Sequence, residues 1–280
     1  MMKDYYADYH VHTEFSDDSV YPIEDVVRDA IKKGIDEICI TDHIDYGVKV
    51  DRDSGEKVII REGYEMYNAD VPKLYNAYSN LKEKYKDRIR IKFGLEFGVQ
   101  THTIPKYNDL FNKFNFDFII LSVHQVDNKE FWAGDYQNGK TQDEYILGYY
   151  NELLKVTEKY HNYSVLGHLD LMNRYDKFYP YPFEKTKDIV EAILKNTINN
   201  GSGIELNTSY KRYGLNSTTP CIEILKMYKD LGGDIITFGS DSHKPEHLGA
   251  YIDEAKDICR NLGYKYFCTF DRMKPNYIKL

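Results

Sequence analysis

Short apolar runs alternate with longer amphipathic runs along nearly the whole chain, and this alternation restricts the fold more than any other feature. Seven runs have the length of single buried strands: residues 6–11, 37–40, 89–95, 116–123, 164–166, 203–206 and 234–238. The segments between them favour helices, at 22–33, 62–86, 105–114, 142–160, 183–199, 219–231 and 246–261. Strands that alternate with helices imply an α/β fold with a parallel sheet, and seven such units favour a closed or distorted barrel.

Other features of the 280 residues bear on domain organisation and location. No Pro/Gly/Ser-rich linker or low-complexity block divides the chain, so we expect one domain over residues 1–280. The charged segment 45–61 predicts a loop excursion at the active site. The four cysteines lack a CxxC spacing, which is typical of free thiols. Because the sequence has no signal segment and no long apolar run, we expect a cytoplasmic protein without membrane contact.

Side chains that can bind metal ions stand at the C-terminal end of every expected strand. In chain order they are His10 and His12, Asp42 and His43, Glu96, His124, His168 and Asp170, Glu205 and Asn207, and Asp241 and His243. A single histidine at a strand end is usually structural, but here most of the nine histidines occupy such positions. The C-terminal strand ends of a parallel barrel meet on the face where active sites form, so these residues predict a metal site.

Spacing and donor type narrow the chemistry of this site. His10/His12 and Asp241/His243 are each two residues apart, which places both side chains of a pair on one face of an extended strand. Asp42 and His43 are adjacent, so we take His43 as a ligand and Asp42 as an outer or proton-handling partner. Imidazole and carboxylate donors without thiolate suit Zn, Mn or Fe. The candidates outnumber the roughly three protein ligands of one catalytic zinc, so two or three ions are expected.

Six motifs follow one another along the chain: HVHTEFSD at 10–17, TDH at 41–43, GLE at 94–96, SVH at 122–124, GHLD at 167–170 and SDSH at 240–243. In this order they resemble the motifs of the PHP (polymerase and histidinol phosphatase) superfamily. The resemblance implies a distorted (β/α)7 barrel, a single PHP-type metallophosphoesterase domain over residues 1–280, and three divalent metal ions (Zn, Mn or Fe) at the strand ends.

The resemblance also implies a set of ligands for each ion. The first ion takes His10, His12, Glu96 and Asp241, and Glu96 bridges to a second ion that His124 holds. The third takes His43, His243 and an acidic residue after HTEFS, and His168 completes one of the last two sites. Both Asp17 and Asp18 fit the acidic position; the usual order of the motif favours Asp17.

Within this superfamily the chain is similar to the histidinol-phosphate phosphatase branch, in IELNTSYKRYG at 204–214 and GSDSHKPEHLG at 239–249. That similarity implies hydrolysis of L-histidinol phosphate to L-histidinol and phosphate, a step of histidine synthesis. A phosphoesterase acting on nucleotides or nucleic-acid ends is the alternative, but the net charge of −8 does not favour a polyanionic partner. A non-catalytic metal-binding scaffold is a further alternative, although no motif ligand is missing. The expected partner is therefore a small phosphorylated substrate, and the oligomeric state stays open.

The expected reaction assigns further roles. Metal ions lower the pKa of bound water from about 15.7 toward roughly 7, so a metal-bridging hydroxide could attack phosphorus. Arg174 and Arg212 follow strands at the right face and are expected to bind the phosphate, together with Asn207. Candidates for protonating the leaving alcohol are Asp17, Asp18, Asp42 and His243. Residues of the segment after His124, including Gln125, Asp127, Phe131 and Trp132, could contact the imidazole and the amine.

Overall fold

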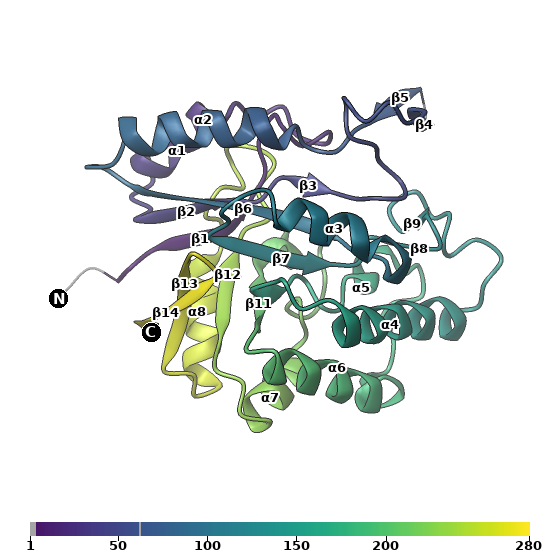
Figure 1. Ribbon diagram of the computed structural model, residues 1–280. Coiled ribbons are helices and arrows are strands. Elements are labelled where there is room, and N and C mark those ends of the chain that lie inside the picture. The colour runs from purple at the N-terminus through teal and green to yellow at the C-terminus, as the bar shows by residue number, and fades with distance from the viewer. Residues whose placement is uncertain (1–3, 62) are drawn as a thin grey trace.

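A computed structural model describes residues 4–61 and 63–280, and its centre is a twisted sheet of parallel strands (Figure 1). In spatial order these strands are β1 (Ala7–Val11), β2 (Glu37–Ile40), β6 (Arg90–Gly98), β7 (Phe118–Ser122), β10 (Val165–Leu166), β11 (Gly203–Asn207) and β12 (Ile236–Gly239). The short strand β3 (His43–Ile44) continues from β2 and also pairs with β6. Each of the seven apolar runs forms one of the main strands, so the expected α/β barrel class is confirmed.

The two edge strands of the sheet, β1 and β12, meet and nearly close the barrel. His12 N donates to Ser242 O at 2.8 Å, and Ser242 N donates to His10 O at 3.2 Å. The buried carboxylate of Asp8 accepts hydrogen bonds from Ser240 N at 2.9 Å and from Gly249 N at 2.8 Å. These bonds bring the ends of the first and last parallel strands together, although they are more than 220 residues apart.

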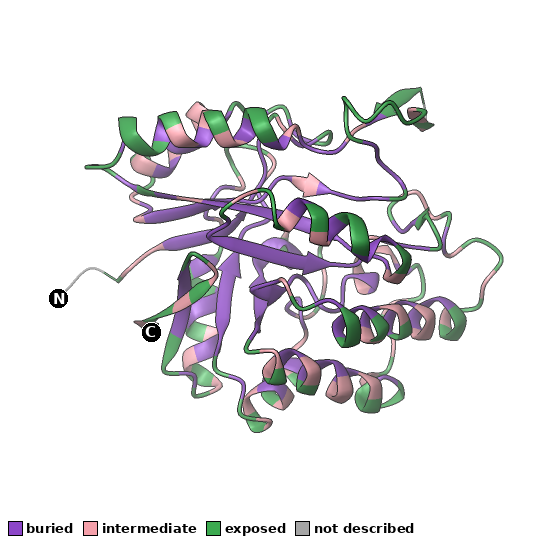
Figure 2. Ribbon diagram, in the orientation of Figure 1, coloured by how far each residue is buried: buried purple, intermediate pink, exposed green. Residues whose placement is uncertain are grey.

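Helices surround the sheet, with buried inner faces and exposed outer faces (Figure 2). They are α1 (Ile23–Lys32), α2 (Val71–Lys84), α3 (Ile104–Phe111), α4 (Gln142–Lys159), α6 (Lys187–Asn199), α7 (Ile222–Asp230) and α8 (Ile252–Asn261). Shorter turns are α5 (Met172–Tyr175), η1 (Thr101–Thr103), η2 (Phe183–Lys185) and η3 (Thr208–Lys211). Helix α4 begins at a capping box in which Thr141 and Glu144 satisfy each other's backbone N–H groups. No helix of the described residues has the length and hydropathy needed to cross a bilayer.

The helix expected over residues 62–86 is too long at its N-terminal end. Residue 62 lies outside the described residues, and β4 (Ile59–Arg61) and β5 (Tyr64–Met66) form an antiparallel hairpin in this region. The helix starts only at Val71, because the Asp70 carboxylate accepts a hydrogen bond from Lys73 N at 3.1 Å and Pro72 occupies the first turn.

Two further hairpins were not expected from the sequence. Strands β8 (Gln125–Val126) and β9 (Lys129–Glu130) follow the C-terminal end of β7. Strands β13 (Tyr266–Asp271) and β14 (Lys274–Lys279) pair near the C-terminus and pack at the other end of the barrel. There the Phe270 ring packs at a tilt against Phe118 with ring centroids 5.0 Å apart, and the Phe270 N–H donates to Tyr9 Oη at 2.7 Å. The C-terminal hairpin therefore covers the barrel end opposite the expected site.

Candidate metal centre

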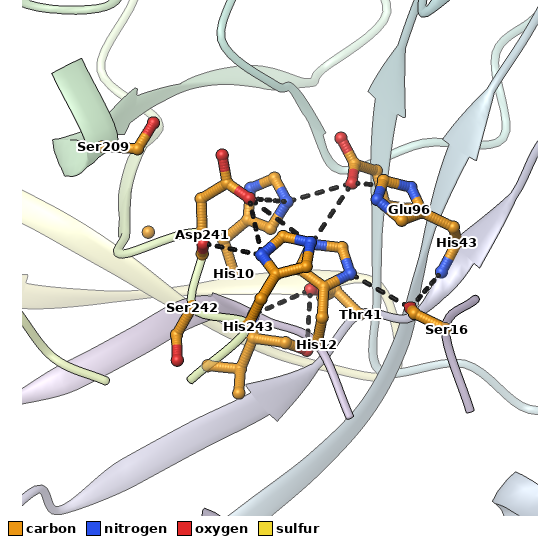
Figure 3. Close-up of polar contacts among 12 residues, drawn as sticks. His10, His12, Ser16, Thr41, His43, Glu96, Ser209, Asp241, Ser242 and His243 are labelled. Atoms are coloured by element: carbon orange, nitrogen blue, oxygen red, sulfur yellow. Dashed lines mark hydrogen bonds and ion pairs between the residues drawn. The ribbon is translucent and has the colours of Figure 1, made fainter. Parts of the chain in front are cut away.

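Glu96, on β6, is at the centre of a buried cluster of histidines at the strand ends (Figure 3). Its Oε2 lies 3.0 Å from His10 Nε2 and 3.2 Å from His43 Nδ1. Its Oε1 lies 3.0 Å from His124 Nε2 and 2.8 Å from His168 Nε2. The two oxygens thus face two different sets of histidines, which is the arrangement that a carboxylate bridging two cations needs.

Asp241 approaches the same cluster from the loop after β12. Its Oδ1 is 3.8 Å from His10 Nε2, 3.6 Å from His12 Nε2 and 3.7 Å from His243 Nδ1. The backbone of Asp241 has φ 54°, a left-handed conformation that is uncommon for residues other than glycine. This turn directs the carboxylate to the histidines that come from the other edge of the sheet.

The preference for Asp17 over Asp18 needs correction, because the structure places Asp18 at the cluster. Asp18 Oδ2 lies 3.0 Å from His243 Nε2 and 3.5 Å from His43 Nε2. Asp17 Oδ1 instead forms an ion pair with Lys49 Nζ at 2.6 Å. Lys49 is a buried residue of the 45–61 loop and also lies 3.1 Å from Asp45 Oδ2. The ammonium group of Lys49 therefore holds Asp17 away from the histidines.

Four overlapping groups of side chains offer possible metal ligands. Within each group, the ligand atoms all lie within 4.8 Å of one another. These groups are His12, Asp18, His43 and His243; His10, His12 and Glu96; His43, Asp45 and His124; and Glu96, His124 and His168. Within the described residues, His12 Nε2, His43 Nδ1 and His168 Nδ1 are buried without a hydrogen-bond partner. A buried polar atom without a partner costs about 1–3 kcal/mol, so a cluster of them beside carboxylates fits bound cations.

The charges of the cluster shift the pKa values of its members in opposite directions. Burial alone would raise the pKa of the Glu96 carboxyl, but His10, His124 and His43 hold it well below its usual range. Burial alone would lower the pKa of His10, whereas Glu205 and Glu96 raise it well above its usual range. The pKa of His12 is lowered by burial and by the neighbouring imidazoles of His243 and His43. A neutral His12 has a lone pair available for a metal ion.

An outer layer of side chains fixes the orientation of three histidines. Glu205 Oε1 lies 2.6 Å from His10 Nδ1, and Asp45 Oδ1 lies 2.8 Å from His124 Nδ1. When each carboxylate accepts the Nδ1 proton, each Nε2 is left to face Glu96. The sequence placed Glu205 only among the metal-competent residues at the strand ends and gave Asp45 no role. The signal for Asp45 was present, since it is two residues after His43 and shares its strand face.

Asp42 orients the third histidine and lies one layer outside the cluster. Its buried carboxylate accepts hydrogen bonds from Thr13 N at 2.6 Å and from Ser16 Oγ at 2.8 Å. Ser16 Oγ in turn lies 3.2 Å from His12 Nδ1. Because the Ser16 proton goes to Asp42, His12 Nδ1 is the donor to Ser16 and its Nε2 faces the cluster. Of the two roles expected for Asp42, the geometry supports the outer one.

The residues expected to bind substrate lie beside Asp241. Arg174 Nη2 donates to Ser209 Oγ at 2.6 Å and to Asp241 Oδ2 at 3.1 Å. Arg212 donates to the backbone carbonyls of Ser240, at 2.7 Å, and of Asp241. Asn207 Nδ2 is 3.4 Å from Asp241 Oδ2. Both guanidinium groups have further N–H donors, so they can support the turn at Asp241 and still face a ligand.

The segment after His124 gives less to the site than expected. Gln125 is buried and donates to the backbone carbonyl of Gly98 at 2.7 Å, and Phe131 packs in the core against Tyr136 and Tyr149. Asp127 forms the turn between β8 and β9, with φ 53°. Only Trp132 of the four residues is a large exposed apolar side chain.

The barrel with a strand-end cluster of histidines and carboxylates defines a class of metal-dependent hydrolases. The family model described as PHP domain matches residues 8–209, and the chain belongs to this family.

Relatives of this chain along its whole length are histidinol-phosphatases. The histidinol-phosphatase of Lactococcus lactis subsp. lactis is 30% identical over 274 residues, which cover 95% of both chains. A probable histidinol-phosphatase of Thermotoga maritima is 29% identical and covers 98% of this chain and 99% of its own. The crystal structure of the Lactococcus lactis histidinol phosphate phosphatase, in complex with zinc, L-histidinol and phosphate, superposes with a TM-score of 0.84 at 28% identity. The match covers 98% of this chain and 100% of that one.

Proposed function

We propose that this protein is a metal-dependent phosphatase that hydrolyses L-histidinol phosphate to L-histidinol and phosphate, a reaction of histidine biosynthesis. The observation that carries the proposal is the complete cluster around Glu96 in a chain that matches histidinol-phosphatases from end to end. The solved relative, which holds zinc, L-histidinol and phosphate, supports the same substrate.

Three divalent ions, Zn or alternatively Mn or Fe, fit the ligand groups. We assign one ion to His10, His12, Glu96 and Asp241, a second to Glu96, His124 and His168, and a third to His43, His243 and Asp18. Bound ions of this kind activate water and neutralise the charge of phosphoryl oxygens. The carboxylates of Glu205 and Asp45, with Ser16, keep three imidazoles turned toward these positions.

The remaining side chains bind the phosphoryl group and handle the proton. Arg174 and Arg212 offer N–H donors in a planar fork, and Asn207 offers its amide beside them. The leaving alcohol needs a proton, and we place its source on the side of Asp18 and His243, which is the more exposed side of the cluster. Asp17 is paired with Lys49 and Asp42 lies in the outer layer, so neither is placed to deliver this proton.

We further propose that residues 1–280 act as one unit and that the reaction takes place in the cytoplasm. Asp241 and His243 lie beyond residue 209, where the family match ends, yet they contact the cluster. All four cysteines are free, and three of them are buried, as expected for a reducing compartment.

One experiment tests the proposal. The zinc-loaded protein is assayed for phosphate release from L-histidinol phosphate, from nucleoside monophosphates and from short oligonucleotides, with its metal content measured in parallel. We expect release from L-histidinol phosphate to exceed that from the other substrates. Equal or faster turnover of nucleotides would contradict the substrate assignment, and bound metal without turnover of any substrate would contradict the catalytic role.

A further inference from the structure

We propose that Tyr213 is a positioning residue for phosphate binding, whose ring holds the guanidinium groups of Arg174 and Arg212 in place. The inference rests on the proposed function, in which these two arginines bind the phosphoryl group. Tyr213 lies just after η3, in the connection between β11, which ends at Asn207, and α7. Tyr213 falls within the stretch IELNTSYKRYG, but the sequence assigned it no role.

The ring of Tyr213 contacts both arginines. Arg174 Cζ is 4.1 Å from the ring centroid, and Arg212 Cζ is 5.4 Å from it. Both distances are within the roughly 6 Å range of cation–π attraction, in which the negative face of an aromatic ring attracts a cation. One aromatic ring therefore contacts the two side chains that are expected to bind the phosphate.

The other contacts of the arginines explain why the ring is needed. Asp241 Oδ2 is 3.1 Å from Arg174 Nη2 and 3.7 Å from Arg212 Nη2, so in this structure one carboxylate compensates both positive charges. A metal ion bound by Asp241 would draw negative charge away from the arginines. The positive charges of Arg174 and Arg212 would then remain close together with less compensation. The ring of Tyr213 attracts both guanidinium groups whether or not Asp241 binds a metal ion.

The ring also restricts a rotation of the guanidinium groups that their hydrogen bonds do not prevent. Arg174 is held at one edge by Ser209, and Arg212 is held at one edge by the backbone carbonyls of Ser240 and Asp241. A guanidinium group held at one edge can still rotate out of the plane that suits two phosphate oxygens. Stacking on a ring restricts that rotation and favours the planar presentation on which bidentate binding depends.

The exposure of Tyr213 agrees with a role at the mouth of the site. The residue is 48% exposed, whereas the side chain of Arg174, which it contacts, is only 8% exposed. A tyrosine needed only for core packing would be buried. Because of this exposure, substitution of Tyr213 should leave the fold and the ligand cluster intact.

The test compares Tyr213→Leu with the matched control Tyr213→Phe, which keeps the ring. The measured quantities are the inhibition constant of inorganic phosphate, KM and kcat for L-histidinol phosphate, and the zinc content. We expect Tyr213→Leu to raise the phosphate inhibition constant and KM about 5- to 30-fold, with unchanged zinc content and a smaller effect on kcat. Tyr213→Phe should remain within about twofold of the wild type, because the cation–π attraction needs only the ring.

A double-mutant comparison separates positioning from direct contact with the substrate. In an Arg174→Ala, Arg212→Ala background, Tyr213→Leu should have no further effect on phosphate binding. Three results would each overturn the proposal. Tyr213→Leu could weaken phosphate binding just as much in the double-Ala background as in the wild type, or it could leave the phosphate inhibition constant of the single variant unchanged. The third result is a Tyr213→Phe variant that binds phosphate as weakly as Tyr213→Leu.

The proposed function and the positioning role can fail separately. Phosphate binding to the zinc-loaded protein is also measured by calorimetry, which needs no turnover. If the wild type does not hydrolyse L-histidinol phosphate but Tyr213→Leu still weakens phosphate binding, only the substrate assignment fails. If the wild type hydrolyses the substrate and Tyr213→Leu binds phosphate normally, only the positioning role fails.

Discussion

Replacing Asp18 by Asn should remove one bound metal ion, whereas the same replacement at Asp17 should leave the metal content unchanged. Asp18 Oδ2 lies 3.0 Å from His243 Nε2 and 3.5 Å from His43 Nε2, so these three side chains converge on one position. The amide of Asn keeps the size of the side chain but removes its charge. A site with two neutral imidazoles and no carboxylate should bind zinc at least about 100-fold more weakly, since loss of an outer partner alone costs 10- to 100-fold.

The cost of Asp17→Asn should appear in stability. The Lys49 ammonium is 2.6 Å from Asp17 Oδ1, and the two side chains are only 7% and 16% exposed. Breaking a buried ion pair costs about 3–5 kcal/mol when the remaining charge is left alone. Lys49 keeps Asp45 at 3.1 Å, so we expect a smaller loss of about 2–3 kcal/mol in the free energy of unfolding. For a chain of this size, that loss lowers Tm by roughly 4–10 °C.

Two measurements on the same preparations distinguish the variants. Zinc is counted by mass spectrometry after loading and gel filtration, and Tm is measured with and without a chelator. Asp18→Asn should lose one zinc equivalent and keep the metal-free Tm of the wild type. Asp17→Asn should keep its full zinc content and have a lower metal-free Tm. Loss of zinc in Asp17→Asn, with full zinc content in Asp18→Asn, would refute the placement of the two aspartates.

Three further predictions concern the barrel and its charges. Chelation of the wild type should lower Tm, and added zinc should restore it, because ions that bind only the folded state stabilise it; an unchanged Tm would argue against a bound metal. Asp8→Ala should reduce the free energy of unfolding, measured in urea, by about 2–3 kcal/mol, because it leaves Ser240 N and Gly249 N without their acceptor. A loss below about 0.5 kcal/mol would contradict the role of Asp8 in closing the barrel. Hydrogen bonds from Lys84 and Tyr85 lower the pKa of Glu24 from 4.5 to about 2, so its contribution to stability is present above pH 4.5 and is lost as the pH falls toward 2. The difference in Tm between wild type and Glu24→Gln should therefore be larger at pH 7 than at pH 3.5, and a constant difference would contradict this pKa.

Local patterns were sufficient to predict the parallel strands and most of the cluster. Buried strands such as β2 are short apolar runs that can be identified in the sequence. Once a strand is identified, the metal-binding residue at its C-terminal end can be identified too. Contacts between distant parts of the chain were not predictable in this way. Nothing in the sequence near Lys49 shows that its ammonium pairs with Asp17, 32 residues earlier, and the choice between the adjacent aspartates depends on that pair.

The C-terminal hairpin and the start of α2 were missed for different reasons. Strands β13 and β14 consist of mixed polar and aromatic residues, and their place at the end of the barrel depends on contacts with Tyr9 and Phe118. The start of α2 was readable, because Asp70 followed by Pro72 is a typical helix start. The helix-favouring residues before Asp70 led to a boundary that was too early.

The alignment of β3 and β6 shows why the ligands meet at all. His43 pairs with Glu96 in the parallel register, and a shift of one residue would turn one of these side chains to the other face of the sheet. Gly98, two residues further along β6, is part of the same arrangement, because a Cβ at this position would overlap the Asp45 carboxylate. Asp45 is the group that turns His124 toward Glu96, so a glycine that binds nothing itself makes room for the orientation of a ligand. The centre thus depends on strand register and on space beside β6 as much as on its ligands, and a motif search identifies only the ligands.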